Sequence, residues 1–190
     1  MVGDTLMKAG GQSAATDRPA AHRMVEETID ATDDLARVTA ALTDLCGSAE
    51  GAGGADLVVV RVTGTSRDAV WPRDVTIQSI NKWERAIRRL EMLDASTVVA
   101  ARGECGGATL DLLLAADHAV VTHDFMLTIP QQQQLAWPGM ALYRLVQRLG
   151  LATARRLVLR PADLTAARAL TLGLIDEVGD DLAALVERAH

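Results

Sequence analysis

Two short apolar runs constrain the fold of this 190-residue chain more than any other feature of its sequence. Residues 56–63 (DLVVVRVT) and 96–101 (STVVAA) are rich in β-branched side chains and do not alternate between apolar and polar positions. Strands with this pattern are typically buried on both faces, as in a parallel sheet that helices cover on its two sides. We therefore expect both runs to be buried strands of such a sheet.

The segments around these strands have the periodicity of amphipathic helices. Between residues 75 and 94, apolar side chains recur at steps of three and four residues, which predicts one long helix. Another helix is expected at 31–46, with Thr32 or Asp33 as its N-cap. Because strands and helices alternate along the chain, the expected fold class is α/β. The apolar stripe of the long helix comprises Ile77, Ile80, Trp83, Ile87 and Leu90; further strands are expected at 23–30, 118–122 and 126–129, and further helices at 140–149, 152–159, 165–172 and the C-terminus.

The length and the composition indicate a single domain with a tail. Residues 1–21 are expected to be disordered, and residues 22–190 are expected to form one domain. The net charge of −6 argues against a general nucleic-acid binder, and no apolar run is long enough to span a membrane. Because no apolar signal core is present, we expect a cytoplasmic protein. Cys46 and Cys105 form no CxxC pair and the four histidines no HExxH motif, so neither a disulfide nor a metal site is expected.

The strongest candidate for a functional site is the stretch 98–111, in which a buried strand runs into a glycine-rich turn that opens a helix near Gly107. The first N–H groups of a helix have no internal acceptor and carry the positive end of the helix dipole, so they can bind an oxyanion. An alternative is that Gly106 and Gly107 only allow the strand and the helix to pack closely. The loop 64–74 follows the other buried strand and would lie at the same end of a parallel sheet, where ligands bind.

Several motifs in register make the chain resemble the crotonase superfamily, the enoyl-CoA hydratases and isomerases. The resemblance covers about residues 56–180 and implies a crotonase-like ββα spiral core with a truncated C-terminal helical region. It also implies a homo-oligomer, either a trimer or a hexamer. The matching positions are Gly64 and Asp74 with Trp71-Pro72-Arg73 between them, the run from Arg102 to Asp111 with Asp117 after it, Pro130-Gln131 with Pro138-Gly139, and a closing run with Arg144-Leu145, Gly150, Ala154, Ala166-Ala167, Ala169-Leu170 and 173–176.

The resemblance assigns roles to individual residues of this chain. Two backbone amides, those of Arg73 and Ala108, would polarise the carbonyl of a CoA thioester. CoA would enter as part of the substrate, and no separate cofactor is expected. The substrate pocket would be lined by Trp71, Glu104, Gly107 and Trp137. Trp71 and Trp137 would alternatively be ordinary core residues.

Hydratases of this superfamily use two carboxylates, and this chain departs from that pattern. The two positions are occupied by Asp111 and by Gln131, which cannot titrate. A single acid is sufficient for dehydration or isomerisation, so Asp111 is expected to be the acid/base and Gln131 to hold a hydroxyl group or water. Glu104 would be a reserve acid. Alternatively, Asp111 lies on the solvent face of its helix and Glu104 is a loop charge.

A finer resemblance concerns the short accessory crotonases of 3,5-dihydroxyphenylglycine biosynthesis, which belong to glycopeptide-antibiotic pathways. It rests on the stretches 82–91, 104–107 and 137–145. It implies dehydration and aromatisation of a polyketide to 3,5-dihydroxyphenylacetyl-CoA, beside a type III polyketide synthase and sister crotonases. The alternative is a catalytically degenerate accessory or scaffold subunit of that synthase. Arg85, Arg88 and Arg89 would contact CoA phosphates or form a solvated face with a Glu84–Arg88 pair.

Overall fold

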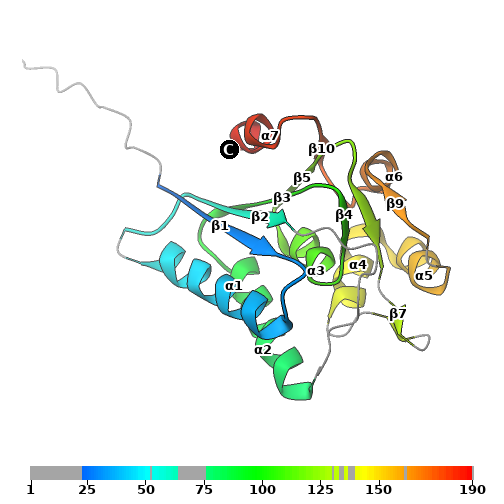
Figure 1. Ribbon diagram of the computed structural model, residues 1–190, viewed down its shortest axis with the longest axis horizontal. Coiled ribbons are helices and arrows are strands. Elements are labelled where there is room, and N and C mark those ends of the chain that lie inside the picture. The colour runs from blue at the N-terminus through cyan, green and yellow to red at the C-terminus, as the bar shows by residue number, and fades with distance from the viewer. Residues whose placement is uncertain are drawn as a thin grey trace, which may run out of the picture.

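A five-stranded sheet forms the centre of the fold (Figure 1). The computed structural model describes residues 23–51, 53–63, 76–129, 131–132, 135–136, 140–160 and 162–189. Every pair of neighbouring strands in this sheet is parallel, and the two apolar runs are adjacent strands in its interior, as their composition predicts. The strand order is β1 (Met24–Asp30), β2 (Leu57–Thr63), β3 (Ser96–Ala101), β5 (His118–Val121) and β10 (Glu177–Val178).

Both faces of the sheet are covered, which explains why its interior strands have no polar face. Figure 1 shows α1 (Leu35–Glu50) and α2 (Ile77–Glu91) on one side and α7 (Leu182–Arg188) on the other. In β2, Val58 and Val60 belong to the main hydrophobic core, whereas Leu57 and Val59 pack in the smaller cluster that contains Leu185 of α7. Successive side chains of a strand point to opposite faces, so a strand covered on both sides is apolar along its buried length, and in β2 the polar residues Arg61 and Thr63 are only half-buried.

Helix α1 begins later than its sequence predicts. Its N-cap is Asp34, whose carboxylate accepts the Arg37 amide proton at 2.8 Å, and neither Thr32 nor Asp33 occupies this position. Thr32 instead donates from its amide and its hydroxyl group to Asp30, which lowers the pKa of that carboxyl group. The prediction was wrong because three adjacent residues are good N-caps, and the turn after β1 already uses the first of them.

The long helix α2 is confirmed, but its first turn lies outside the core. Trp83, Ile87 and Leu90 are buried as the stripe predicts, whereas Ile77 is 78% exposed. The helix starts with a capping box in which Thr76 and Ser79 each satisfy the other's backbone amide. The start of α2 projects beyond the sheet at the lower edge of Figure 1, and Ile77, the first residue of the helix, is exposed there among the described residues.

The smaller elements depend on long-range pairing, and the sequence pattern predicts them less well. The strand β4 (Glu104–Gly106) pairs with β6 (Met126–Thr128), which pairs in turn with β9 (Leu164–Thr165). Strands of two or three residues are too short to show a period, so β4, β9 and β10 were not predicted. The remaining elements are α3 (Ala108–Ala115), the hairpin of β7 (Gln131–Gln132) and β8 (Leu135–Ala136), α4 (Ala141–Leu149), α5 (Leu151–Leu159) and α6 (Ala166–Leu172).

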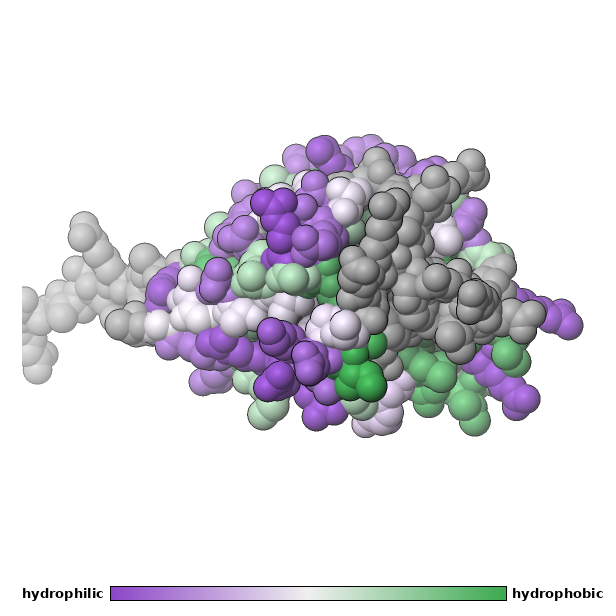
Figure 2. Space-filling view, turned by 60° about the horizontal axis from the view of Figure 1, so that its bottom comes forward, coloured by the Kyte–Doolittle hydropathy of each residue, from purple (hydrophilic) through white to green (hydrophobic). Residues whose placement is uncertain are grey.

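The surface is mostly hydrophilic on the face that Figure 2 shows, with a hydrophobic patch at the lower edge of the view. Exposed large apolar side chains of the structure include Leu142 and Tyr143 of α4 and Leu151 and Leu159 of α5. Among the described residues, no helix has the length and apolar character that crossing a membrane requires. The predicted disordered segment 1–21 lies outside the described residues.

Candidate active site

The carboxyl ends of β2 and β3 meet at one edge of the sheet, as parallel strands require. Val62 pairs with Ala101 at this edge, so the segments that follow the two strands start side by side. The segment after β2 carries the predicted donor Arg73 and the predicted pocket residue Trp71, and both lie outside the described residues. The structure therefore describes one of the two segments that the sequence assigns to the site.

The described segment is a glycine turn that leads from β3 through β4 into α3. Gly103 and Gly107 have φ values of 67° and 53°, which residues with a Cβ rarely adopt. Gly107 is the N-cap of α3 and has no side chain to cap the first amides. The Ala108 amide thus stands at a helix N-terminus that offers N–H groups to an acceptor. The positive φ requires a glycine at position 107 whether or not an oxyanion binds there. The turn is therefore compatible with both interpretations, an oxyanion site and close packing of the strand against the helix.

Asp111 is fully buried, with 0% of its surface exposed, so the alternative that it lies on a solvent face is wrong. All eight residues of α3 are buried, and the helix therefore has no solvent face. The Asp111 Oδ2 atom accepts a hydrogen bond from the indole Nε1 of Trp83 at 2.8 Å, and Oδ1 lies 3.7 Å from Nη1 of Arg144. Three helices, α2, α3 and α4, contribute to this contact.

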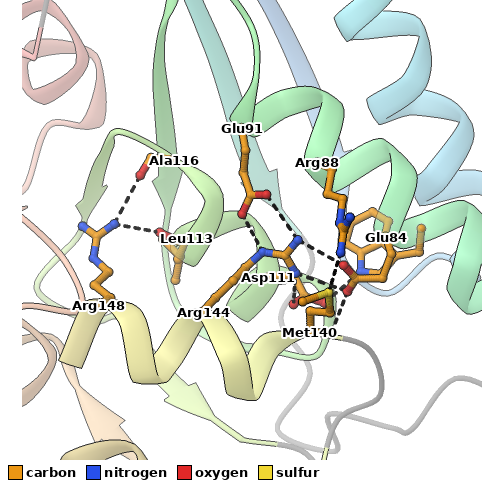
Figure 3. Close-up of polar contacts among 10 residues, drawn as sticks. Glu84, Arg88, Glu91, Asp111, Leu113, Ala116, Met140, Arg144 and Arg148 are labelled. Atoms are coloured by element: carbon orange, nitrogen blue, oxygen red, sulfur yellow. Dashed lines mark hydrogen bonds and ion pairs between the residues drawn. The ribbon is translucent and has the colours of Figure 1, made fainter. Parts of the chain in front are cut away.

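Arg144 is the centre of a charged cluster between α2 and α4 (Figure 3). Its side chain is only 6% exposed, and it donates from Nε to Glu91 at 2.6 Å and from Nη2 to Glu84 at 3.0 Å. Burial by itself would lower the pKa of Arg144, but the hydrogen bonds to Glu91 and Glu84 outweigh burial and raise this pKa. The guanidinium group is therefore a permanent positive charge beside Asp111.

The solvated Glu84–Arg88 pair of the sequence interpretation is replaced by contacts with α4. Besides binding Arg144, Glu84 accepts the backbone N–H of Met140 at 2.7 Å, and Arg88 contacts the Met140 sulfur atom (Figure 3). A carboxylate at the first turn of a helix also interacts favourably with the helix dipole. The stripe of α2 that contains Glu84, Arg88 and Glu91 therefore faces α4, and packing of the two helices determines its partners.

The other predicted site residues are only partly placed. Glu104 lies in β4 and is half-buried, next to the glycine turn. The backbone of Gln131 lies in β7, where it pairs with Ala136, but its side chain and the whole of Trp137 lie outside the described residues. The structure thus brings Gly107, Ala108 and Asp111 together through α3 and does not relate them to Gln131.

The sequence interpretation gave no site role to Trp83, Arg144, Glu84 and Glu91. Trp83 was assigned to the core because of its place in the apolar stripe, and Arg144 was noted only as part of a motif. The available signal was chemical: a buried carboxylate and a buried indole N–H both need hydrogen-bonding partners. The pairing itself joins residues 28 positions apart and is not visible in local periodicity.

Both cysteines are expected to be unreactive in the folded protein. Burial raises the pKa of Cys105 to about 12 and that of Cys46 to about 11, so neither forms much thiolate at neutral pH. We expect slow modification by a thiol reagent at pH 8 and rapid modification of both thiols in denaturant, followed by absorbance. Rapid labelling of either cysteine in the native protein would contradict this expectation.

Comparison with known proteins gives one extensive sequence similarity and several fold similarities. No protein-family model matches the chain. Over 152 residues the chain is 45% identical to an enoyl-CoA-hydratase of Amycolatopsis orientalis, and the match covers 78% of this chain and 70% of that protein. A crystal structure of an enoyl-CoA hydratase from Shewanella pealeana matches with a TM-score of 0.75 and 15% identity, covering 88% of this chain and 69% of that one.

A second solved structure agrees with the first. It is an enoyl-CoA hydratase/isomerase from Marinobacter aquaeolei, with a TM-score of 0.73 and 18% identity, and the match covers 87% of this chain and 72% of the other. At such low identities the structural similarities concern the fold alone. They confirm the predicted α/β class and its spiral arrangement of strands and helices.

Proposed function

The chain belongs to the crotonase superfamily of enoyl-CoA hydratases and isomerases, and from this membership we propose that it acts on an acyl-CoA thioester. The observation that carries the proposal is the arrangement on α3. The Ala108 amide stands at the N-terminus of α3, where no side chain of the N-cap binds it, and Asp111 follows in the first turn of the same helix. This arrangement supports a mechanism in which one turn of α3 supplies both an oxyanion donor and a carboxylate.

In this proposal the amides of Arg73 and Ala108 bind the thioester oxygen and stabilise the enolate that forms when a proton leaves the adjacent carbon. Losing one such donor costs roughly 3–4 kcal/mol of transition-state stabilisation. Asp111 takes that proton and returns it to a departing hydroxyl group, so one carboxylate completes a dehydration that releases water. Gln131 orients the hydroxyl group, Glu104 is a reserve acid, and Trp71, Gly107 and Trp137 complete the pocket.

We further propose that the substrate is a polyketide thioester and the product is 3,5-dihydroxyphenylacetyl-CoA. The support is the resemblance of 82–91, 104–107 and 137–145 to accessory crotonases that work beside a type III polyketide synthase. Because Gln131 cannot titrate, the proposed mechanism uses a single carboxylate to move the proton, and the stability of the aromatic product favours the direction of dehydration. The same resemblance supports a homo-oligomer, a trimer or a hexamer, that works with this synthase and with sister crotonases.

A second candidate function is that of a non-catalytic accessory subunit of the synthase. The observation that favours it is the environment of Asp111, whose two oxygens face the Trp83 indole and the Arg144 guanidinium group in a fully buried position. A carboxylate held in this way can have a purely structural role. The two functions differ in whether the Asp111 and Gln131 side chains are needed for the effect on product formation.

The test uses purified synthase with and without the protein. Products released from the synthase are separated by chromatography, and the yield of the aromatic thioester is measured. We expect the wild-type protein to raise this yield and the double variant Asp111→Asn, Gln131→Ala to lose the effect while remaining folded by circular dichroism. A folded double variant that still raises the yield would establish the accessory role.

A further inference from the structure

We propose that Trp83 and Arg144 are positioning residues for the Asp111 carboxylate and that the glutamates of α2 hold Arg144 in place. The inference deepens the proposed function, because it concerns the same carboxylate. Its basis is that each oxygen of Asp111 faces a different helix: Oδ2 receives the Trp83 indole proton at 2.8 Å, and Oδ1 lies 3.7 Å from Arg144 Nη1. Two contacts from two helices fix the rotation of a carboxylate, which one contact would leave free.

The Trp83 contact is rigid because the indole ring has no freedom to move. The residue is 1% exposed and belongs to the main hydrophobic core, on the same helix face as Ile87 and Leu90. Its N–H group is a single donor with a fixed direction. A buried indole N–H without a partner would be costly, so the packing of α2 and the orientation of Asp111 support each other.

The Arg144 contact is rigid for a different reason. The guanidinium group is planar, and its donors have a fixed fork geometry. Glu91 accepts a hydrogen bond from Nε, and Glu84 accepts one from Nη2. The remaining nitrogen, Nη1, is directed toward Asp111 and the second carboxylate oxygen of Glu84 (Figure 3). Rotation of the guanidinium plane would break both charge-assisted hydrogen bonds. Glu84 and Glu91 thus determine which nitrogen faces Asp111.

The charges that face Asp111 predict the state in which it is held. From α2 it faces the Trp83 donor, with the carboxylates of Glu84 and Glu91 behind, and from α4 it faces the Arg144 cation. The indole donor and the cation both favour the charged form of Asp111, whereas its complete burial and the two nearby glutamates oppose that form. The contacts with Trp83 and Arg144 therefore fix the orientation of Asp111, and the Arg144 cation lowers the cost of its charged form.

The test follows the Trp83 indole N–H resonance in the ¹⁵N-labelled full chain as the pH is changed, with Trp83→Phe used to assign it. In the double variant Glu91→Gln, Arg144→Gln, one negative and one positive charge are removed together, so the net charge of the cluster is unchanged. The chemical shift of the Trp83 indole N–H follows the titration of Asp111. In the double variant we expect the midpoint of this titration to rise by about one to three pH units, the effect of losing an opposite charge at this distance. Arg148→Gln, from the next turn of α4, is the control and is expected to leave the midpoint near its wild-type value, because Arg148 binds Asp176 and not Asp111.

A kinetic readout separates positioning from simple structural support. Trp83→Phe and the double variant are expected to lower kcat about tenfold to a hundredfold, the usual effect of losing an outer partner of a functional group, while KM changes little. If the double variant does not fold, the second charge-balanced pair, Glu84→Gln with Arg144→Gln, takes its place in both measurements. An unchanged midpoint would overturn the proposal, as would an unchanged kcat in folded variants. Should the wild type lack thioester turnover, the proposed function fails, and the resonance titration still decides whether Arg144 and Trp83 position Asp111.

Discussion

Replacing Asp111 with Asn is expected to lower kcat for dehydration of a 3-hydroxyacyl-CoA about a hundredfold to ten-thousandfold, the usual contribution of a general acid/base. The amide cannot take the proton from the carbon beside the thioester, whereas the Ala108 amide remains available to bind the carbonyl oxygen. We therefore expect KM to change much less than kcat. The measurement is steady-state turnover with 3-hydroxybutyryl-CoA, accompanied by a thermal melt of each protein.

The matched control is Asp117→Asn, at the residue between the C-cap of α3 and the first residue of β5. Asp117 accepts hydrogen bonds from the amide and the hydroxyl group of Thr97, so its role is structural. This variant is expected to lose some stability and to keep its turnover per folded molecule. Equal turnover in folded Asp111→Asn and wild-type protein would show that Asp111 is not the acid/base and would favour the accessory function.

Replacing Arg144 with Ala is expected to lower the free energy of unfolding by about 3–5 kcal/mol, the effect of breaking a buried ion pair by removing one partner. The arginine is 6% exposed and lies within 4 Å of three carboxylates, those of Glu84, Glu91 and Asp111. Its removal leaves negative charges facing one another without a cation. Urea unfolding followed by circular dichroism at neutral pH measures the difference.

The difference in unfolding free energy between wild type and Arg144→Ala has a predictable dependence on pH. Because the hydrogen bonds to Glu91 and Glu84 outweigh burial and raise the pKa of Arg144, its contribution is fully present below the ordinary pKa of arginine and is lost only as the pH rises through the raised one. The difference between wild type and Arg144→Ala should therefore stay constant as the pH rises from neutral to about 10. A difference that shrinks over this range would contradict the assignment.

Arg148→Ala is the control for the Arg144 experiment. Arg148 also lies on α4, but its side chain is 19% exposed, and it forms an ion pair with Asp176. Figure 3 shows its contacts with the carbonyl oxygens of Leu113 and Ala116. Those carbonyl groups can take water when the arginine is removed, so the expected loss is smaller. If Arg148→Ala lowers the free energy of unfolding as much as Arg144→Ala does, burial of the charged cluster does not increase the cost of removing the arginine.

The sequence predicts the central elements of the fold because their patterns are local. The β-branched run of β2 lacks alternation and so indicates a strand buried on both faces, and the apolar stripe of α2 follows from the 3.6-residue period of a helix. The short strands β4, β9 and β10 could not be predicted, since they exist only through pairing with distant segments. The N-cap of α1 was misplaced because Thr32, Asp33 and Asp34 are all suitable, and only the turn after β1 selects among them.

For the candidate site, the sequence by itself determined the glycine turn, the position of Ala108 at the start of α3, and the order of motifs that indicates a CoA thioester. Only the tertiary structure decided that Asp111 is buried and that Trp83 and Arg144 are its partners. The physical reason is that such contacts depend on how α2, α3 and α4 are rotated against one another. This rotation is determined by the packing of all their apolar side chains together, and no local period of a single helix contains it.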